Sequence, residues 1–499
     1  MFNAEFFAFI FYFLAVLAIG LVFFFKSKDA GEKEYFLGGR SMGPWVTAMS
    51  AQASDMSGWL LMGFPGSILA FGMGQAWIGI GLAIGTIANW LLIARRLRMF
   101  SAAANDSITL PQYLSNRFAT KSRALQIICA IVFLVFFTVY VASSFVAGTT
   151  VFTSIFNIDE SIAMLIFVAI LLAYTFLGGY KAVCWTDFFQ GLMMLIALLA
   201  IPITIVIFKD LDTTLLSKVI VGNDGTEYKF VSNIFSASWQ EIASGLAWGL
   251  GYFGMPHILV RFMGIKKASL VKKSATVAIV WVILALLAAI LIAFFGRMLV
   301  GEELLATNQQ KMVFIALARM LFPGFISGLL MAAIIAASMS TADSQLLVAS
   351  SSFTADIYKP VFRKNASSKE ILWIGRLVVI VVSIIAYFIA SSEGSGAQAI
   401  MNMVENAWGG FGAAFGAIVI LSVFWRRFTY KGAIAGVVVG AVVDVLWLLF
   451  LSKPTGLYEL LPGFIASMIA AVVATLLDKA PSKEVTDIYD RAVSSEFAD

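Results

Sequence analysis

Apolar runs long enough to cross a lipid bilayer recur along the whole of this sequence. A helix needs about 20 predominantly apolar residues to span the hydrocarbon core. Thirteen such runs begin near Phe6, Pro44, Ala76, Gln126, Ser161, Phe188, Glu241, Ala275, Phe322, Ile371, Ile400, Gly432 and Leu460. Of the 499 residues, 61% are hydrophobic and 13% charged, whereas soluble domains are about half apolar and about a quarter charged. The sequence therefore predicts an all-α polytopic membrane protein, built as a single transmembrane domain over residues 1–499.

The positive charges in the loops predict how the chain is oriented. If the N-terminus lies outside, most of the 34 Lys and Arg residues fall on the cytoplasmic side, where such residues are enriched. We therefore expect an odd number of spans, with the N-terminus outside and the C-terminus in the cytoplasm. The longest connections are residues 94–125 and 209–240, and the polar segment 478–499 is expected to be a mobile cytoplasmic tail.

Two of the predicted spans are interrupted. Span two contains SAQASDMSGWLLMG (residues 50–63), and span seven contains GLAWGLGYFGMPHILVRF (residues 245–262), which is broken by glycines and a proline. The two spans are five apart in sequence. Interrupted segments at corresponding places in two halves are typical of inverted-repeat transporters, whose binding sites lie at the breaks. We expect residues 44–208 to form the first repeat and residues 241–425 the second.

Asp55 lies within the interruption of span two. Backbone carbonyls that a break frees inside a membrane need a partner, and carbonyl oxygens suit a hard cation. A carboxylate in this position also needs compensation, because its insertion costs about 2.5–3.5 kcal/mol. The alternatives are that Asp55 pairs with an arginine or accepts hydrogen bonds from the end of the broken helix.

Span nine carries a second group of oxygen ligands in AAIIAASMSTADSQLL (residues 332–347). Ala337, Ser340 and Thr341 share one helix face because they stand at positions i, i+3 and i+4. Small and hydroxyl residues on a membrane helix also favour close helix packing or bond to their own helix. Together with an interrupted span two, this pattern favours a cation site.

Aromatic residues accompany the break in span seven. Trp248, Tyr252 and Pro256 follow at intervals of four residues, and Tyr140 in span four adds a ring with a hydroxyl. Such rings can hold a small amphipathic solute, although most membrane aromatics pack in cores or lie at the lipid interface. Glu405 and Asp444 also fall in apolar spans, where pairing is the default expectation for a charge.

Five segments resemble the sodium/solute symporter family, and within it the sodium/proline symporters. They are SAQASDMSGWLLMG, GGYKAVCWTDFFQG, WGLGYFGMPHILVRFMG, AASMSTADSQLL and FWRRFTYKGAIAGVVVGAVV, in this order along the chain. The resemblance covers most of the sequence. It implies about thirteen transmembrane helices around a five-plus-five inverted-repeat, LeuT-like core that is formed by spans two to eleven.

The resemblance also implies roles for individual residues. A sodium site is implied at the carbonyls of Ala53, Met56 and Ala337 and the hydroxyls of Ser340 and Thr341. Asp55 and Ser57 are implied in the coupling of sodium and substrate, with Asp55 at the sodium site and Ser57 at the substrate site. The substrate site is implied at Tyr140, Trp248, Tyr252 and Pro256, and ion-dependent gating at Arg40 and Asp187. Met255 departs from the family pattern, because close relatives are expected to carry a glutamine there.

These features together predict a sodium-coupled symporter that imports L-proline across a bacterial cell membrane. Sodium is expected as the co-transported ion, and we expect no organic cofactor, no nucleic-acid partner and no enzymatic activity. An enzyme would need a nucleophile with its base or clustered metal ligands, whereas the chain has one histidine and two cysteines. Alternatives are a family member for pantothenate, a sugar or another amino acid, and a proton-coupled carrier. Lipid surrounds the chain, and the oligomeric state is left open.

Overall fold

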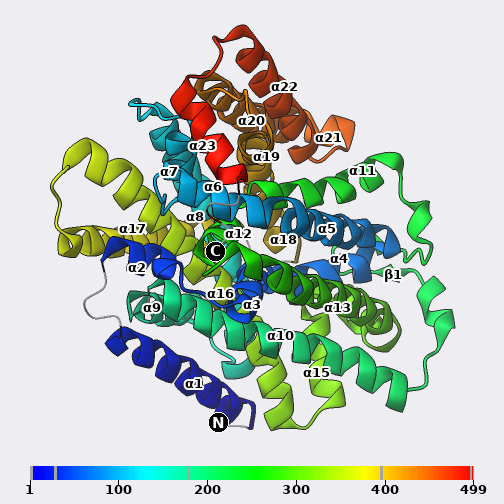
Figure 1. Ribbon diagram of the computed structural model, residues 1–499. Helices are drawn as coiled ribbons and strands as arrows, with labels where there is room; N and C mark the ends of the chain where they lie inside the picture. Colours follow the sequence, from blue (N-terminus) through cyan, green and yellow to red (C-terminus); the bar gives the residue numbers. More distant parts are fainter. Residues whose placement is uncertain (1–3, 27–30, 178, 394–396, 495–496, 498–499) are drawn as a thin grey trace.

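The computed structural model describes residues 4–26, 31–177, 179–393, 397–494 and 497, and these are almost entirely helical (Figure 1). Within these described residues, ten helices are long and apolar enough to cross a membrane. The thirteen predicted spans correspond to α1 (Ala4–Lys26), α3–η2–α4 (Pro44–Asp55, Trp59–Gly63, Phe64–Phe71), α5–η4–α6 (Ala76–Ala88, Asn89–Ala94, Arg95–Ala103), α8 (Ala124–Phe156), α9 (Glu160–Leu177), α10 (Tyr180–Phe208), α11–η7–α12 (Trp239–Ala247, Trp248–Phe253, Pro256–Gly264), α13 (Val271–Leu299), α16–η10 (Gly324–Ser351, Ser352–Phe362), α17 (Ser368–Glu393), α18–η11–α19 (Ala397–Phe411, Gly412–Gly416, Ala417–Phe424), α20 (Tyr430–Phe450) and α22 (Leu460–Leu477). The prediction of an all-helical, multi-span protein is confirmed.

Shorter elements connect these spans. They are α2 (Glu32–Leu37), η1 (Gly38–Arg40), η3 (Met73–Gln75), α7 (Leu110–Arg117), η5 (Thr213–Ser217), η6 (Ile234–Ser236), η8 (Ala268–Leu270), α14 (Gly301–Ala306), η9 (Gln310–Met312), α15 (Val313–Leu321), α21 (Ser452–Thr455) and α23 (Lys483–Val493). Strands β1 (Ile220–Val221) and β2 (Glu227–Tyr228) form an antiparallel hairpin in which Ile220 pairs with Tyr228. Below, "outer" and "inner" refer to the orientation that the loop charges predict.

Helix α16 lies at the centre of the structure. Its residues 330–351 are all buried, and it packs against α1, α3, α8, α10 and α17. Figure 1 shows α3, α12 and α16 in the middle of the molecule, with α1, α17 and α22 at its edge. The edge helices expose apolar faces, as Trp373, Leu377 and Phe388 of α17 show. Such apolar faces suit contact with lipid. The central helices carry more polar groups, which find protein partners in the interior.

Both predicted interruptions are present. Helix α3 ends at Asp55, and a π-helical segment begins at Trp59 and leads into α4. In span seven, α11 ends at Ala247, a 3₁₀ segment follows, and α12 starts at Pro256. Proline suits this first helical position because it has no N–H to leave unpaired.

Two spans were predicted too short, because polar residues lower the hydropathy at one end of each. Span six begins at Tyr180 instead of near Phe188, and span three continues as helix to Ala103. Several polar groups in these extensions have protein partners. Arg96 donates to the Val423 carbonyl and Arg98 to the Ile265 carbonyl, at 3.0 and 2.7 Å. Such pairing lets charged residues continue a membrane helix.

The prediction of a mobile tail was wrong for the residues that form α23. This helix packs against α6 and α7, and Val485 and Ala492 are buried. The buried Arg117 donates to the Val485 carbonyl at 3.1 Å, and Arg426 pairs with Asp490. Overall polarity hid an amphipathic helix whose apolar residues recur at helical spacing.

Spans three and seven approach closely through glycine. A β-carbon at Gly85 would overlap the backbone of Gly249, including its carbonyl oxygen. We therefore expect Gly85→Ala to lower the midpoint of thermal unfolding in detergent by several degrees, since overpacking costs about 1–3 kcal/mol. Gly31→Ala is the control, because nothing lies within 4 Å of its added β-carbon. Equal midpoints for the two variants would contradict this packing.

Candidate functional site

The break in span two redirects the hydrogen bonds of its backbone. Met56 leaves the helical conformation at φ −86° and ψ 78°. The Ser57 N–H donates to the Asp55 carbonyl at 3.1 Å, two residues back. In a continuous helix that N–H would donate to Ala53, four residues back. The Ala53 carbonyl is therefore available to a group from outside its own helix.

Helix α16 supplies that group. The Ser340 hydroxyl lies 2.8 Å from the Ala53 carbonyl and 3.2 Å from the Ala337 carbonyl, and the Thr341 hydroxyl lies 3.5 Å from the Ala53 carbonyl. The structure thus brings together four of the five residues predicted for the cation site. Met56 stands at the break beside them, although no hydrogen bond links its carbonyl to these hydroxyls in the described part of the chain.

The backbone carbonyls at the break in span seven have a different kind of hydrogen-bond partner. The Trp408 indole N–H donates to the Trp248 carbonyl at 2.8 Å, and the Asn89 amide donates to the Tyr252 carbonyl at 3.0 Å. These partners are N–H groups, which have no lone pair to offer a cation. A hydroxyl can turn and accept instead of donating. The oxygen cluster at Ala53 and Ser340 is therefore the better candidate for a cation.

Asp55 links the two breaks. Its carboxylate accepts a hydrogen bond of 2.5 Å from the Tyr252 hydroxyl, and its carbonyl accepts one of 3.3 Å from Tyr140. The residue is only 1% exposed, and its Oδ1 has no hydrogen-bond partner within the described residues. The structure therefore gives Asp55 a tyrosine partner in place of the arginine or the N–H groups considered as alternatives. One oxygen of a buried carboxylate is left to interact with a positive group.

An aromatic cluster lies next to Asp55. The Trp248 ring lies 6.3 Å from Trp408 and 6.4 Å from Trp59, and the Tyr252 ring meets Trp408 edge-on at 5.0 Å. Trp59 and Trp408 were missed in the sequence. Trp59 stands directly after the break in span two, so its position was a usable signal, whereas Trp408 is brought in from span eleven by tertiary packing alone.

The other predicted substrate residues are buried close to the two helix breaks. Ser57 is buried at the break, and its hydroxyl accepts a hydrogen bond of 3.5 Å from the Trp59 N–H. Pro256 is buried at the start of α12, directly after the buried Met255. Tyr140 is fully buried on α8, beside His257. The predicted substrate residues therefore come from spans two, four and seven and lie near the two helix breaks.

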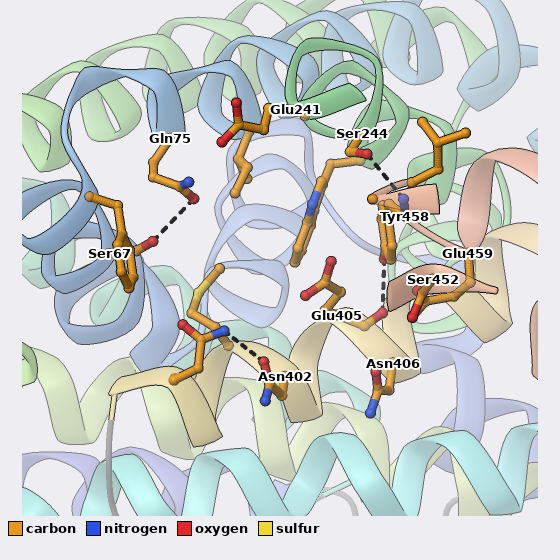
Figure 2. Close-up of a pocket in the computed structure, with 18 of the residues that line it drawn as sticks. Ser67, Gln75, Glu241, Ser244, Asn402, Glu405, Asn406, Ser452, Tyr458 and Glu459 are labelled. Carbon is orange, nitrogen blue, oxygen red and sulfur yellow. Dashed lines mark hydrogen bonds between the residues drawn. The ribbon is translucent and has the colours of Figure 1, made fainter. Parts of the chain in front are cut away.

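A cavity of about 530 Å³ opens on the outer side of the aromatic cluster (Figure 2). Its lining includes Trp248 and reaches the outer ends of α4, α11, α18 and α20. Because the cavity ends at Trp248, a solute from the outer side can reach the aromatic cluster.

The predicted gating residue Arg40 lies on the inner side. Its guanidinium donates to Asp106 at 2.8 Å and to the Met263 and Ser107 carbonyls at 2.5 and 2.9 Å. Burial alone would raise the pKa of Asp106, but hydrogen bonds from Lys33 and Arg40 hold it below its ordinary value. Arg40 therefore joins the inner ends of spans two, three and seven.

Asp187 lies deeper and binds a residue that the sequence interpretation missed. Its carboxylate pairs with Arg261 of α12 at 3.2 Å, and both side chains are 0% exposed. Ser50 of α3 donates to Asp187 at 2.6 Å, and Arg261 also contacts Ser344 of α16. An arginine within span seven was itself a signal, since intramembrane charges are rare and need partners. The pair joins four central helices.

Comparisons with known proteins give one family. The model of the sodium:solute symporter family matches residues 35–440. The chain is 40% identical to a sodium/proline symporter of Haemophilus influenzae, over 98% of both chains, and 43% identical to one of Escherichia coli, over 94% of this chain and 92% of that one. A solved outward-open structure of a sodium-coupled sialic acid symporter aligns with a TM-score of 0.74 over 97% of this chain and 99% of that one, at 21% identity. A nucleobase-cation-symport-1 family transporter aligns with a TM-score of 0.54 over 92% and 98%, at 15% identity. These two similarities support the fold.

The buried pair of Asp187 and Arg261 predicts a stability effect. Removing one member of a buried ion pair costs about 3–5 kcal/mol, because the other charge is left uncompensated. Arg261→Met should therefore lower the thermal midpoint of the purified protein strongly, and Arg261→Met with Asp187→Leu should recover part of the loss. Arg426→Met is the control, since it removes an exposed pair worth about 0–1 kcal/mol. Equal effects of the two single substitutions would contradict this assignment.

Proposed function

This chain belongs to the sodium:solute symporter family, and we propose that it imports L-proline together with sodium across the cell membrane. The family that the sequence motifs predicted is thereby confirmed, and it is a family of transporters, not of enzymes. Several relatives that match along nearly their full length are named sodium/proline symporters. Their similarity of 40% and more supports the same substrate here.

The observation that carries the proposal is the contrast between the two helix breaks. At span seven, fixed N–H donors satisfy the freed carbonyls, and aromatic rings surround them. At span two, the freed Ala53 carbonyl is contacted by two hydroxyl groups, which can rotate to accept instead of donate. This difference favours a cation at span two and an organic solute beside span seven. Asp55 and Tyr252 connect the two places through one hydrogen bond.

We assign sodium to the oxygen cluster between α3 and α16. Its ligands would be the carbonyls of Ala53, Met56 and Ala337 and the hydroxyls of Ser340 and Thr341. All five ligands are neutral oxygens, which suit a hard monovalent cation. The carboxylate of Asp55 lies two residues from Ala53 and contributes a negative charge that favours cation entry in this buried region.

We assign proline to the space beside the aromatic cluster, where Trp248, Tyr252, Tyr140, Pro256 and Ser57 would form the site. Proline is a zwitterion with an apolar ring, so it needs apolar contact as well as compensation for two charges. Aromatic faces attract an ammonium and also pack against aliphatic carbon. The buried Met255 adds an apolar wall where a glutamine was expected.

Arg40 and Asp187 would act as inner gating residues. Their contacts join spans two, three, six, seven and nine on the inner side, while the cavity opens on the outer side. Movement of the proposed repeats, residues 44–208 and 241–425, would break one set of contacts and form another. The assignment includes an external N-terminus and a cytoplasmic C-terminus.

Sodium entry would supply the driving force. Ligand and cation couple only if each binds better when the other is present, and the two effects must be equal. One sodium ion moving down an inward-negative potential releases about 2.3 kcal/mol per 100 mV.

The proposed function is tested by uptake of labelled L-proline into proteoliposomes under sodium, potassium or proton gradients. Accumulation under sodium alone is expected, and accumulation under every gradient would overturn the proposal.

Thr341→Ala should raise the sodium concentration for half-maximal uptake by roughly tenfold or more, since a hydrogen bond or ligand to a charged group contributes about 1.5–3 kcal/mol. Thr354→Ala is the matched control, because the Thr354 hydroxyl bonds within its own helix, to the Ser350 carbonyl at 2.8 Å. Both variants are compared at equal protein in the liposomes. Wild-type sodium dependence of Thr341→Ala would remove this residue from the cation site.

Trp248→Ala should raise the proline concentration for half-maximal uptake about tenfold, because it removes an aromatic wall worth about 1–2 kcal/mol. Trp248→Phe should retain most of the affinity. Trp373→Ala serves as a control, since Trp373 is exposed on the edge helix α17. Unchanged proline affinity in Trp248→Ala would place the substrate elsewhere.

A further inference from the structure

Side chains from three other elements cap the inner end of span eleven. Helix α19 ends at Phe424, and a regular helix leaves its last four carbonyls without a partner. The Leu421 carbonyl accepts a hydrogen bond of 2.9 Å from the Trp425 N–H, directly after the helix. The other three carbonyls have side-chain donors at 3.0 Å: Arg117 for Ser422, Arg96 for Val423 and Tyr489 for Phe424. The end of span eleven is therefore held mainly from outside its own helix.

These caps join the two proposed repeats through the C-terminal helix α23. Span eleven closes the second repeat, whereas Arg96 of α6 and Arg117 of α7 belong to the first. Figure 1 shows α23 beside α6, α7 and α19. The Tyr489 hydroxyl of α23 accepts from Arg96 at 3.4 Å while it donates to span eleven. One hydroxyl thus contacts a segment of each repeat.

Apolar and aromatic packing attaches α23 to the first repeat. It packs against α6 and α7, and its Val485 and Ala492 side chains are buried. The Tyr489 ring meets Phe100 of α6 edge-on at 5.2 Å, and the Arg117 guanidinium lies 5.2 Å from the centroid of the Tyr489 ring. Exposing buried apolar surface to water is unfavourable. We therefore expect α23 to move together with α6 and α7.

The contacts between α23 and the end of span eleven are polar and reach the surface. The Tyr489 hydroxyl donates to the Phe424 carbonyl, and Asp490 accepts two hydrogen bonds from Arg426, at 2.8 and 2.6 Å. The side chains of Arg426 and Asp490 are 55% and 50% exposed. Exposed ion pairs contribute little net stability, because water solvates the charges when the pair opens. These contacts can therefore break and re-form more readily than the packing against α6.

We propose that α23 is an inner latch, which holds the end of span eleven against α6 and α7 while the outer cavity is open. Its contacts with span eleven through Tyr489 and Asp490 break when the inner side opens to release the solute. The latch rests on the proposed function, because it assumes a transport cycle with an inward-open state. Arg40 and Asp187 join other spans deeper in the protein, so the latch adds a second, superficial set of contacts to the same closed side.

Tyr489→Phe removes the hydroxyl of the latch and keeps the aromatic ring. A weaker latch leaves fewer molecules in the outward-facing state, and apparent affinity falls with that fraction. In sodium-driven uptake by the full-length protein in proteoliposomes, the half-saturating concentrations of proline and sodium should therefore rise together, by a factor of about two to ten. Tyr430→Phe is the matched control, since the Tyr430 hydroxyl bonds to Ser122 at 2.9 Å, away from the latch. Unchanged values in Tyr489→Phe would overturn the latch, as would a rise for only one of the two ligands.

A covalent latch tests the proposal in the opposite direction. Arg426→Cys and Asp490→Cys are combined in the full-length chain, with alanine in place of the two native cysteines, Cys129 and Cys184. A short thiol-reactive cross-linker that a reductant can cleave then joins the two new cysteines. Cross-linking should abolish sodium-driven uptake, the reductant should restore it, and binding of labelled proline in sodium should persist throughout.

The two single-cysteine variants, treated with the same reagent, are the controls and should keep their uptake. Full uptake after complete cross-linking would overturn the latch, as would loss of proline binding together with uptake. These results leave wild-type transport intact, whereas failure of the proposed function would show as no sodium-driven proline uptake by the wild-type protein.

Discussion

Backbone groups inside a membrane must have partners, and this protein breaks two of its helices there. The consequence at span two is a freed Ala53 carbonyl, which Ser340 of α16 contacts at 2.8 Å. At span seven, side chains from spans three and eleven satisfy the freed carbonyls. The central helices are therefore joined through the breaks themselves. An ion bound between the Ala53 carbonyl and the Ser340 hydroxyl would replace their hydrogen bond, and would therefore change the contact between α3 and α16 directly.

The same constraint explains why Asp55, Asp187 and Arg261 are buried in the core together with polar partners. Asp55 bonds to Tyr252, and Asp187 pairs with Arg261, so spans two, six and seven are linked by polar contacts that lipid could not provide. Close glycine packing between spans three and seven leaves little space between their backbones. Tight packing and paired charges favour a few discrete arrangements over continuous deformation, which a transporter with alternating access requires.

The sequence predicted the spans and both breaks because hydropathy, proline and glycine act locally. It also predicted the oxygen cluster, since Ala337, Ser340 and Thr341 share a face on one helix. The sequence did not reveal that Trp408 and Asn89 cap the carbonyls of span seven, because spans eleven and three are distant in sequence. The partner of Asp187 was missed for the same reason. The helix α23 was missed because its average polarity concealed one apolar face, and the packing of Val485 became apparent only with α6 and α7 in place.

In the proposed mechanism, sodium at span two and solute beside span seven stabilise each other through the hydrogen bond between Asp55 and Tyr252. The most direct test is equilibrium binding to the purified protein, measuring proline affinity with and without sodium and sodium affinity with and without proline. We predict that each ligand tightens the other by the same factor, and that Asp55→Asn brings this factor close to one. Proline affinity that is equal in sodium and potassium for the wild-type protein would contradict this coupling of the two sites.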